Sequence, residues 1–300
     1  MAMPDAVTIV EVGPRDGLQN EPRTAPTAVK IALIERLAAA GLGVIEAASF
    51  VSPKAVPQLA DGAEVMAGLS LGQGVRYPVL VPNMKGFDAA MAAGAQEIAI
   101  FGSPSESFTQ ANINCSVAVS LERFRPVCEA AGALGVAVRG YVSCTLGCPF
   151  EGDMEPAAVA RFAARLRDMG CFEISLGDTI GIGTPDTARA MFEAVAAELP
   201  VDRLAAHFHD THGRALDNLR AVLELGVTVI DASVAGLGGC PYAPGAAGNV
   251  ATEHVVGLLD DLGIACGVDP DRLGQAGRFI CDALGRPYES VSPFPGLRDK

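Results

Sequence analysis

Residues 172–208 read FEISLGDTIGIGTPDTARAMFEAVAAELPVDRLAAHF and contain one complete strand–helix–strand unit. The apolar runs at its two ends, Phe172–Leu176 and Leu204–Phe208, are typical of buried strands. Between them, Pro185–Leu199 is rich in alanine and begins with a proline, which suits the first turn of a helix. Strands that alternate with helices of this length predict a parallel sheet covered by helices.

The same alternation continues on both sides of this unit and gives eight strand candidates in all. They are Val7–Val12, Val44–Ala48, Arg76–Val81, Glu97–Phe101, Ala137–Ser143, Phe172–Leu176, Leu204–Phe208 and Thr228–Ser233. The clearest helical segments between them are Thr27–Ala40, Leu121–Leu134, Pro156–Met169, Pro185–Leu199 and Arg214–Leu225. Eight such units predict an α/β fold of the (β/α)8 TIM-barrel type rather than an open, doubly wound sheet.

The chain beyond the last strand candidate adds to this barrel. A Gly-rich loop starts at about Gly236, and two additional C-terminal helices are expected at Ala247–Leu262 and Pro270–Leu284. Because no segment has the composition of a linker or a repeat, we expect a single domain over residues 1–300, with its core at about 7–284. Val291–Lys300 is expected to be a frayed tail.

Composition limits the class of protein. A chain of 300 residues that is 50% hydrophobic can bury a large core, which excludes general disorder. With 22 Lys and Arg against 35 Asp and Glu, the net charge is −13, which argues against nucleic acid or an anionic membrane as a partner. We find no apolar run long enough to cross a membrane and no secretion signal. The eight cysteines are scattered, so we expect a cytoplasmic protein with reduced thiols.

Charged residues stand where the first two predicted strands end. Arg15 and Asp16 directly follow the first strand, and Glu46 lies inside the apolar second strand. Chemistry in a TIM barrel takes place at the carboxyl ends of the strands. A carboxylate in an apolar strand is costly unless it is paired, and Arg15 is the natural partner of Glu46. A loop salt bridge or a purely structural buried ion pair would give the same pattern.

Two histidines follow each other at strand spacing in the seventh predicted strand. Because side chains alternate along a strand, His207 and His209 point the same way, with Asp210 next to them. Two imidazoles on one inward face beside a carboxylate favour a divalent-metal pair over a satisfied core histidine. In the strand before, Ser175 and Asp178 are expected to face the same end of the barrel, although Gly-Asp-Thr also occurs in ordinary turns.

The loop after the eighth strand has the composition of a lid. Four glycines surround Cys240, which suits a reactive thiol on a mobile loop but equally a flexible turn with an incidental cysteine. Asn249, at the start of the next segment, is either a helix N-cap or a neutral oxygen ligand. The chain contains no nucleotide-binding glycine motif, so nothing indicates NAD or ATP chemistry.

Four of these segments resemble the hydroxymethylglutaryl-CoA (HMG-CoA) lyase family. They are GPRDGLQNE at 13–21, Glu46 with SFVSPK at 49–54, SLGDTIG at 175–181 and SVAGLGGCPY at 233–242. The resemblance covers about Val7 to Leu284. The Arg–Asp, Glu and His-x-His pattern is shared with a wider group of barrels, which includes isopropylmalate and homocitrate synthases and carboxyltransferase domains. The segment GLGGCPY at 236–242 is more specific to the lyases.

The resemblance implies a metal-dependent carbon–carbon lyase of leucine catabolism and ketone-body formation. Such an enzyme cleaves an acyl-CoA thioester, HMG-CoA, to acetyl-CoA and acetoacetate, and it forms a homodimer. The implied cofactor is Mg²⁺ or Mn²⁺, and its implied ligands are Asp16, His207, His209 and Asn249. These oxygen and nitrogen donors suit a hard, octahedral ion.

The resemblance also implies the residues that act on the substrate. The implied catalytic residues are Arg15, Glu46, Asp178, His207 and Cys240, and the implied substrate contacts are Arg15, Gln19, Asn112, Tyr141 and Ser175. Arg15, held by Glu46, would stabilise the charge that develops on the thioester oxygen. Cys240 would protonate the acetyl-CoA carbanion, while Asp178 or His207 would take the proton from the substrate hydroxyl.

Three other functions are compatible with parts of this pattern. A lyase for a longer branched 3-hydroxyglutaryl-CoA needs only a roomier pocket. A Claisen-type synthase uses the same barrel, and a non-catalytic barrel would bind metal or CoA without turnover. Lys54, Lys85 and Arg139 are the candidate cations for CoA. His212 departs from the family pattern, which usually has an aromatic residue there, and we expect it to point to solvent.

Overall fold

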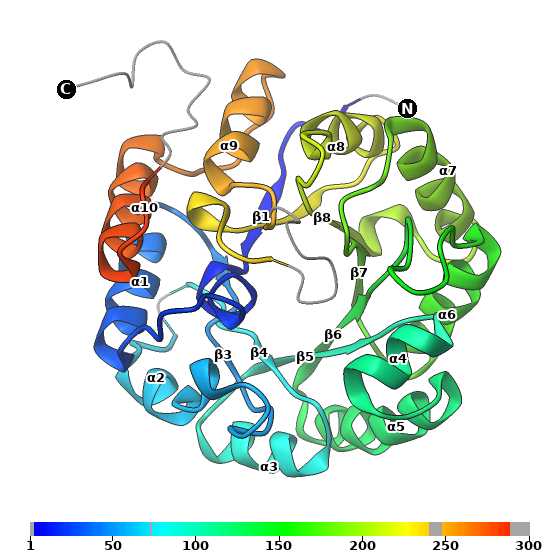
Figure 1. The fold of residues 1–300 in the computed structure, drawn as a ribbon, viewed down its shortest axis with the longest axis horizontal. Helices are drawn as coiled ribbons and strands as arrows, with labels where there is room; N and C mark the ends of the chain where they lie inside the picture. The colour runs from blue at the N-terminus through cyan, green and yellow to red at the C-terminus, as the bar shows by residue number, and fades with distance from the viewer. Residues whose placement is uncertain (1–2, 73, 240–247, 289–300) are drawn as a thin grey trace.

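The strands form a parallel sheet that curls into a barrel with the helices outside it (Figure 1). The computed structural model describes residues 3–72, 74–239 and 248–288. Its strands are β1 Thr8–Glu11, β2 Val44–Ile45, β3 Ala48–Ser49, β4 Val79–Leu80, β5 Glu97–Gly102, β6 Ala137–Val142, β7 Glu173–Asp178, β8 Leu204–Phe208 and β9 Val229–Ala232. The hydrogen-bonded order is β2-β1-β9-β8-β7-β6-β5-β4-β3, and all neighbouring strands that pair are parallel.

The two ends of this order are halves of one predicted strand, and they close the ring. β2 pairs with β1, β3 pairs with β4, and only Glu46 and Ala47 separate them along the chain. The amide of Glu46 donates to the carbonyl of Glu11, and the amide of Ala47 donates to the carbonyl of Pro78. The predicted second strand therefore contacts both of its neighbours, and the predicted (β/α)8 barrel is confirmed.

Helices surround the barrel. They are α1 Thr27–Ala39, α2 Gly62–Gly68, α3 Met84–Ala92, α4 Glu106–Ile113, α5 Val117–Leu134, α6 Pro156–Asp168, α7 Pro185–Ala196, α8 Ala215–Leu223, α9 Thr252–Asp261 and α10 Pro270–Leu284. The helix predicted from residue 270 has the predicted bounds, whereas α2, α3 and α4 are short and had not been predicted. Of the described helices, none is long and apolar enough to cross a membrane.

The described residues just before α9, 248–251, run beside β8 and not in a helix, so the helix predicted from Ala247 begins later. Ala247 itself lies outside the described residues. The amide of Val250 donates to the carbonyl of Phe208, and the amide of Asp210 donates to the carbonyl of Gly248. α9 begins only at Thr252, with Ala251 as its N-cap residue. Asn249 is therefore not a helix cap, and these bonds hold it level with His209.

The floor of the barrel contains a buried arginine, which corrects the proposal that Arg139 binds CoA. Arg139 on β6 is 1% exposed, and its two terminal nitrogens donate to Asp231 at 3.0 and 2.7 Å. Its Nε atom donates to Glu173 at 2.6 Å. A guanidinium so enclosed and paired cannot reach a phosphate outside the barrel.

Glu11, the last residue of β1, is a buried carboxylate held by neutral donors. Its Oε1 accepts from the amides of Gly13 at 2.8 Å and Val234 at 2.9 Å, and its Oε2 accepts from the hydroxyl of Thr252 at 2.6 Å. Burial raises the pKa of Glu11 from 4.5 to about 7, although these three hydrogen bonds oppose the shift. At pH values between these two, Glu11 is therefore ionised in the unfolded chain and protonated in the folded protein, so folding takes up a proton.

We expect the Glu11→Gln variant to gain stability over the wild type as the pH rises. The pKa of Glu11 is higher in the folded state than in the unfolded state, so ionising this carboxylate destabilises the folded protein. The loss of stability is absent below about pH 4.5 and complete above about pH 7. Glutamine keeps the length of the side chain and does not ionise. Urea unfolding at pH 5 and pH 8 should show the advantage of the variant growing by about 2 kcal/mol. An advantage that is equal at both pH values would contradict the raised pKa.

Candidate active site

A tight turn after β1 presents the first two polar side chains of the site. The backbone amides of Arg15, Asp16 and Gly17 all donate to the carbonyl of Val12, at 3.2, 2.7 and 3.1 Å. A Cβ atom at Gly17 would lie 2.6 Å from the hydroxyl of Ser233, so this close approach requires glycine. The turn Gly13–Gly17 thus holds Arg15 and Asp16 together at the carboxyl end of the barrel.

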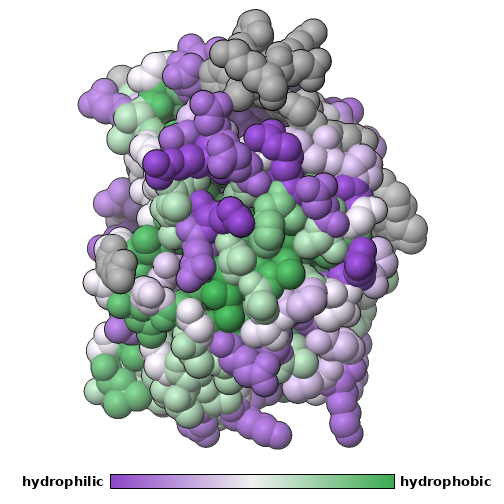
Figure 2. Space-filling view, turned by 90° about the vertical axis from the view of Figure 1, so that its left-hand side faces the viewer, coloured by the Kyte–Doolittle hydropathy of each residue, from purple (hydrophilic) through white to green (hydrophobic). Residues whose placement is uncertain are grey.

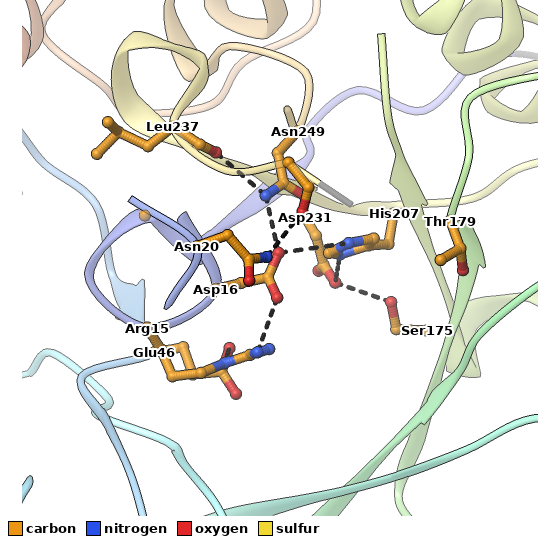
Figure 3. Close-up of polar contacts among 12 residues, drawn as sticks. Arg15, Asp16, Asn20, Glu46, Ser175, Thr179, His207, Asp231, Leu237 and Asn249 are labelled. Atoms are coloured by element: carbon orange, nitrogen blue, oxygen red, sulfur yellow. Dashed lines mark hydrogen bonds and ion pairs between the residues drawn. The ribbon is translucent and has the colours of Figure 1, made fainter. Parts of the chain in front are cut away.

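Arg15 lies between two carboxylates, as Figure 3 shows. Its Nε donates to Glu46 at 2.7 Å and its Nη1 donates to Asp16 at 2.8 Å, while the face of Tyr141 lies 5.6 Å from the guanidinium carbon. The predicted Arg15–Glu46 pair is therefore present. Burial lowers the pKa of Arg15, but the charges of Glu46 and Asp16 outweigh burial and raise it, so this cation is permanent.

Asp16, His207 and His209 converge on one point. One ligand atom from each lies within 4.8 Å of the others, which is close enough to share one metal ion. Burial raises the pKa of Asp16, but Arg15 and the two histidines outweigh it and lower the pKa to about 2, so the carboxylate is ionised. Burial and the neighbouring His207 lower the pKa of His209 to about 4, so this imidazole is neutral near pH 7.

Asn249 joins this group from the segment beside β8. Its Nδ2 donates to Asp16 at 2.8 Å and to the carbonyl of Leu237 at 3.2 Å. The Nδ1 atom of His209 is buried and has no hydrogen-bond partner among the described residues. The carboxylate, the two imidazoles and the side-chain amide together form a donor set that fits a divalent cation. The unpartnered nitrogen of His209 is one of these donors.

Sequence reasoning missed Asp231, whose carboxylate contacts a ring nitrogen of His207 (Figure 3). The Nδ1 atom of His207 lies 3.1 Å from Asp231, whose carboxylate also accepts from the hydroxyl of Ser175 at 2.8 Å. Burial lowers the pKa of His207, but the hydrogen bond and charge of Asp231 outweigh burial and raise it. A carboxylate inside an apolar strand was the available signal, the same one that singled out Glu46.

A pocket of about 350 Å³ opens beside these residues. Among the predicted substrate contacts, it is lined by Arg15, Gln19, Asn112 and Tyr141, together with Asp16, His207 and His209. Ser175 and Asp178 do not line it. The hydroxyl of Ser175 is engaged by Asp231, and the carboxylate of Asp178 accepts from the amides of Ile182 at 3.2 Å and Gly183 at 2.8 Å.

The predicted thiol, Cys240, lies outside the described residues. The residue before it, Gly239, lines the pocket, and its carbonyl accepts from the side-chain amide of Asn20 at 2.8 Å. Lys54 and Lys85, the remaining candidates for CoA, are both exposed and stand close in sequence to the pocket-lining residues Ala55 and Asn83. His212 is exposed, as expected.

Comparison with known proteins identifies close relatives. A family model described as HMGL-like matches residues 6–280. A curated hydroxymethylglutaryl-CoA lyase from Gallus gallus is 60% identical over 289 residues, which cover 96% of this chain and 97% of that protein. The crystal structure of hydroxymethylglutaryl-CoA lyase from Pseudomonas aeruginosa has 56% identity and a TM-score of 0.95, with 97% of each chain covered.

A third relative was solved with ligands. The structure of an HMG-CoA lyase from Acinetobacter baumannii in complex with coenzyme A and 3-methylmalate has 36% identity and a TM-score of 0.93, and covers 100% of this chain and 99% of that one. The comparison also corrects the predicted location. Curated relatives are named as mitochondrial, so the prediction of a cytoplasmic protein is wrong: these names point to mitochondria.

Proposed function

The chain belongs to the HMG-CoA lyase family, and we propose that it cleaves HMG-CoA to acetyl-CoA and acetoacetate. The observation that carries this conclusion is the match over nearly the full length of named lyases, combined with Arg15, Asp16, His207 and His209 around one pocket. The protein is a carbon–carbon lyase, and this reaction fits leucine catabolism.

Asp16, His207, His209 and the amide oxygen of Asn249 would hold the metal ion, for which we propose Mg²⁺ or Mn²⁺. When bound, such an ion lowers the pKa of a coordinated hydroxyl and orients it. Three of the four side chains line the pocket, so a substrate there lies beside this group. The carboxylate oxygen of Asp16 and the amide oxygen of Asn249 support this choice, since oxygen donors suit Mg²⁺ and Mn²⁺.

His207 is our candidate for the base that takes the proton of the C3 hydroxyl. Its Nδ1 is engaged by Asp231 at 3.1 Å, whereas its Nε2 lies on the side of Asp16, at 4.0 Å. A hydrogen bond at Nδ1 fixes the tautomer and leaves Nε2, which can either hold the ion or accept a proton. While His207 acts as the base, the ion would therefore be held by Asp16, His209 and Asn249. Asp178 is the other candidate, but both of its carboxylate oxygens accept hydrogen bonds from backbone amides. These contacts support a role in shaping the loop after β7.

Arg15 is our candidate for stabilising the departing enolate. As the hydroxyl proton leaves, the C3 carbonyl forms, the C2–C3 bond breaks and its electron pair moves to the thioester as an enolate. A buried guanidinium that is already oriented by Glu46 and Asp16 can meet this charge without reorganising. A proton delivered to C2 then completes acetyl-CoA, and Cys240 remains our proposed donor.

Acetoacetate release by the purified, reduced protein tests the proposed function. We expect turnover of HMG-CoA with Mg²⁺ or Mn²⁺, loss of turnover in EDTA and recovery when the ion is restored. If the folded protein with either ion releases no acetoacetate, HMG-CoA is not its substrate, and a longer branched thioester should be assayed next.

We further propose that the chain acts as one catalytic domain and as a homodimer, as the family resemblance implies. The helices α1 and α10 lie on the side of the barrel that Figure 2 presents, where apolar residues gather between polar groups above and below. A molar mass of twice 30.8 kDa in light scattering would support the dimer.

A further inference from the structure

Glu11 joins three segments that each lead to a group of the site. Its Oε1 is shared by the amide of Gly13, at the start of the turn that carries Arg15 and Asp16, and by the amide of Val234. Its Oε2 accepts from Thr252, three residues after Asn249. One fully buried carboxylate therefore ties together β1, the segment after β9 and the first residue of α9.

The segment that starts at Val234 reaches the site within a few residues. The carbonyl of Leu237 accepts from the side chain of Asn249, which in turn donates to Asp16. Backbone bonds close the same unit, since the amide of Ser233 donates to Val250 and the amide of Thr252 donates to Ser233. A shift at any of the three segments would thus change the distance between Asp16 and Asn249.

The fit around Glu11 leaves little freedom. A Cβ atom at Gly13 would lie 2.5 Å from Oε1 of Glu11, so the backbone comes as close to the carboxylate as a glycine allows. Next to Val234, Ala235 has a positive φ of 57° and its amide donates to Glu253 at 2.9 Å. The start of this segment is therefore held by two carboxylates at consecutive amides.

We propose that Glu11 is a positioning residue. It acts through the backbone and fixes the relative positions of Asp16, Asn249 and Arg15 that cation binding and turnover require. The inference rests on the proposed function, because it assigns Asp16 and Asn249 to the cation. Glu11 itself does not line the pocket and so does not contact the substrate.

The length of the side chain provides the test. Aspartate is shorter by one methylene and cannot reach all three donors, whereas glutamine keeps the reach and can still accept from both amides. We expect Glu11→Asp to lower kcat and Mn²⁺ affinity by roughly 10- to 100-fold, as for other residues that support metal ligands. We expect Glu11→Gln to stay within about threefold of the wild type in both.

Glu97→Asp is the matched control. Glu97 is also a buried glutamate in a strand, but it begins β5 at the opposite end of the barrel, where it pairs with Arg76. Thr252→Val removes only the Oε2 contact and keeps the test available if Glu11→Asp fails to fold. The melting temperature, kcat and direct Mn²⁺ titration should be measured for each variant.

The outcomes separate the inference from the proposed function. Glu11→Asp or Thr252→Val with a lowered melting temperature but wild-type kcat and Mn²⁺ affinity would overturn the positioning role, since Glu11 would then be merely structural. If the wild type binds Mn²⁺ but does not cleave HMG-CoA, the proposed function fails. The Mn²⁺ titration of the variants would still decide the role of Glu11.

Discussion

The Arg15→Gln variant is expected to lose roughly 10³-fold in kcat for acetoacetate release, at the upper end of what removal of one transition-state donor costs. Arg15 supplies a permanent charge that Glu46 and Asp16 already orient. Glutamine keeps a donor but not the charge, and it removes the cation that is paired with the fully buried Glu46. Single-turnover assays with saturating Mg²⁺ would measure the loss at the chemical step.

Two further variants show whether this loss reflects the site. Arg76→Gln also removes an arginine from a buried glutamate, Glu97, but at the amino end of the strands, and it should leave kcat within about threefold. Arg15→Lys keeps the charge without the planar fork and should fall between wild type and Arg15→Gln. A kcat for Arg15→Gln within tenfold of the wild type would exclude Arg15 as the stabiliser of the enolate.

The fold could be predicted because its periodicity is carried by long, regular segments. Eight apolar runs separated by Ala-rich helices are enough to choose a barrel, and the split of the second strand into β2 and β3 does not disturb that count. The short helix α2 could not be predicted, because a segment of seven residues carries too little pattern. The start of α9 was misplaced because its preceding residues pair with β8, a long-range contact.

One rule explains both the successes and the errors at charged residues. A charge in an apolar strand needs a buried partner, and this correctly joined Glu46 to Arg15. The same rule applied to Arg139 and Asp231 would have paired them across the barrel, which removes Arg139 from the CoA candidates and places Asp231 behind His207. By contrast, the backbone donors to Asp178 come from a loop whose path no local pattern specifies.

The Asp16→Asn variant is expected to lose at least about 100-fold in Mn²⁺ affinity and roughly 10³-fold in turnover at fixed metal, since several kcal/mol of transition-state stabilisation depend on the ion. Asp16 is the anion of the proposed ligand set, because its pKa of about 2 keeps it ionised while His209, with a pKa of about 4, is neutral. Asparagine has the same shape but brings no charge to the ion. Manganese titration and acetoacetate release across a range of Mn²⁺ concentrations would measure both losses.

The fold should survive this change, because Arg15 keeps Glu46 as its partner when Asp16 becomes neutral. Asp61→Asn is the comparison, since Asp61 also pairs with a buried cation, Lys30, but does not line the pocket. That variant should lose stability and keep its Mn²⁺ affinity. If Asp16→Asn binds Mn²⁺ as tightly as the wild type, then Asp16 is not a ligand, and its role reduces to orienting Arg15, which it contacts at 2.8 Å.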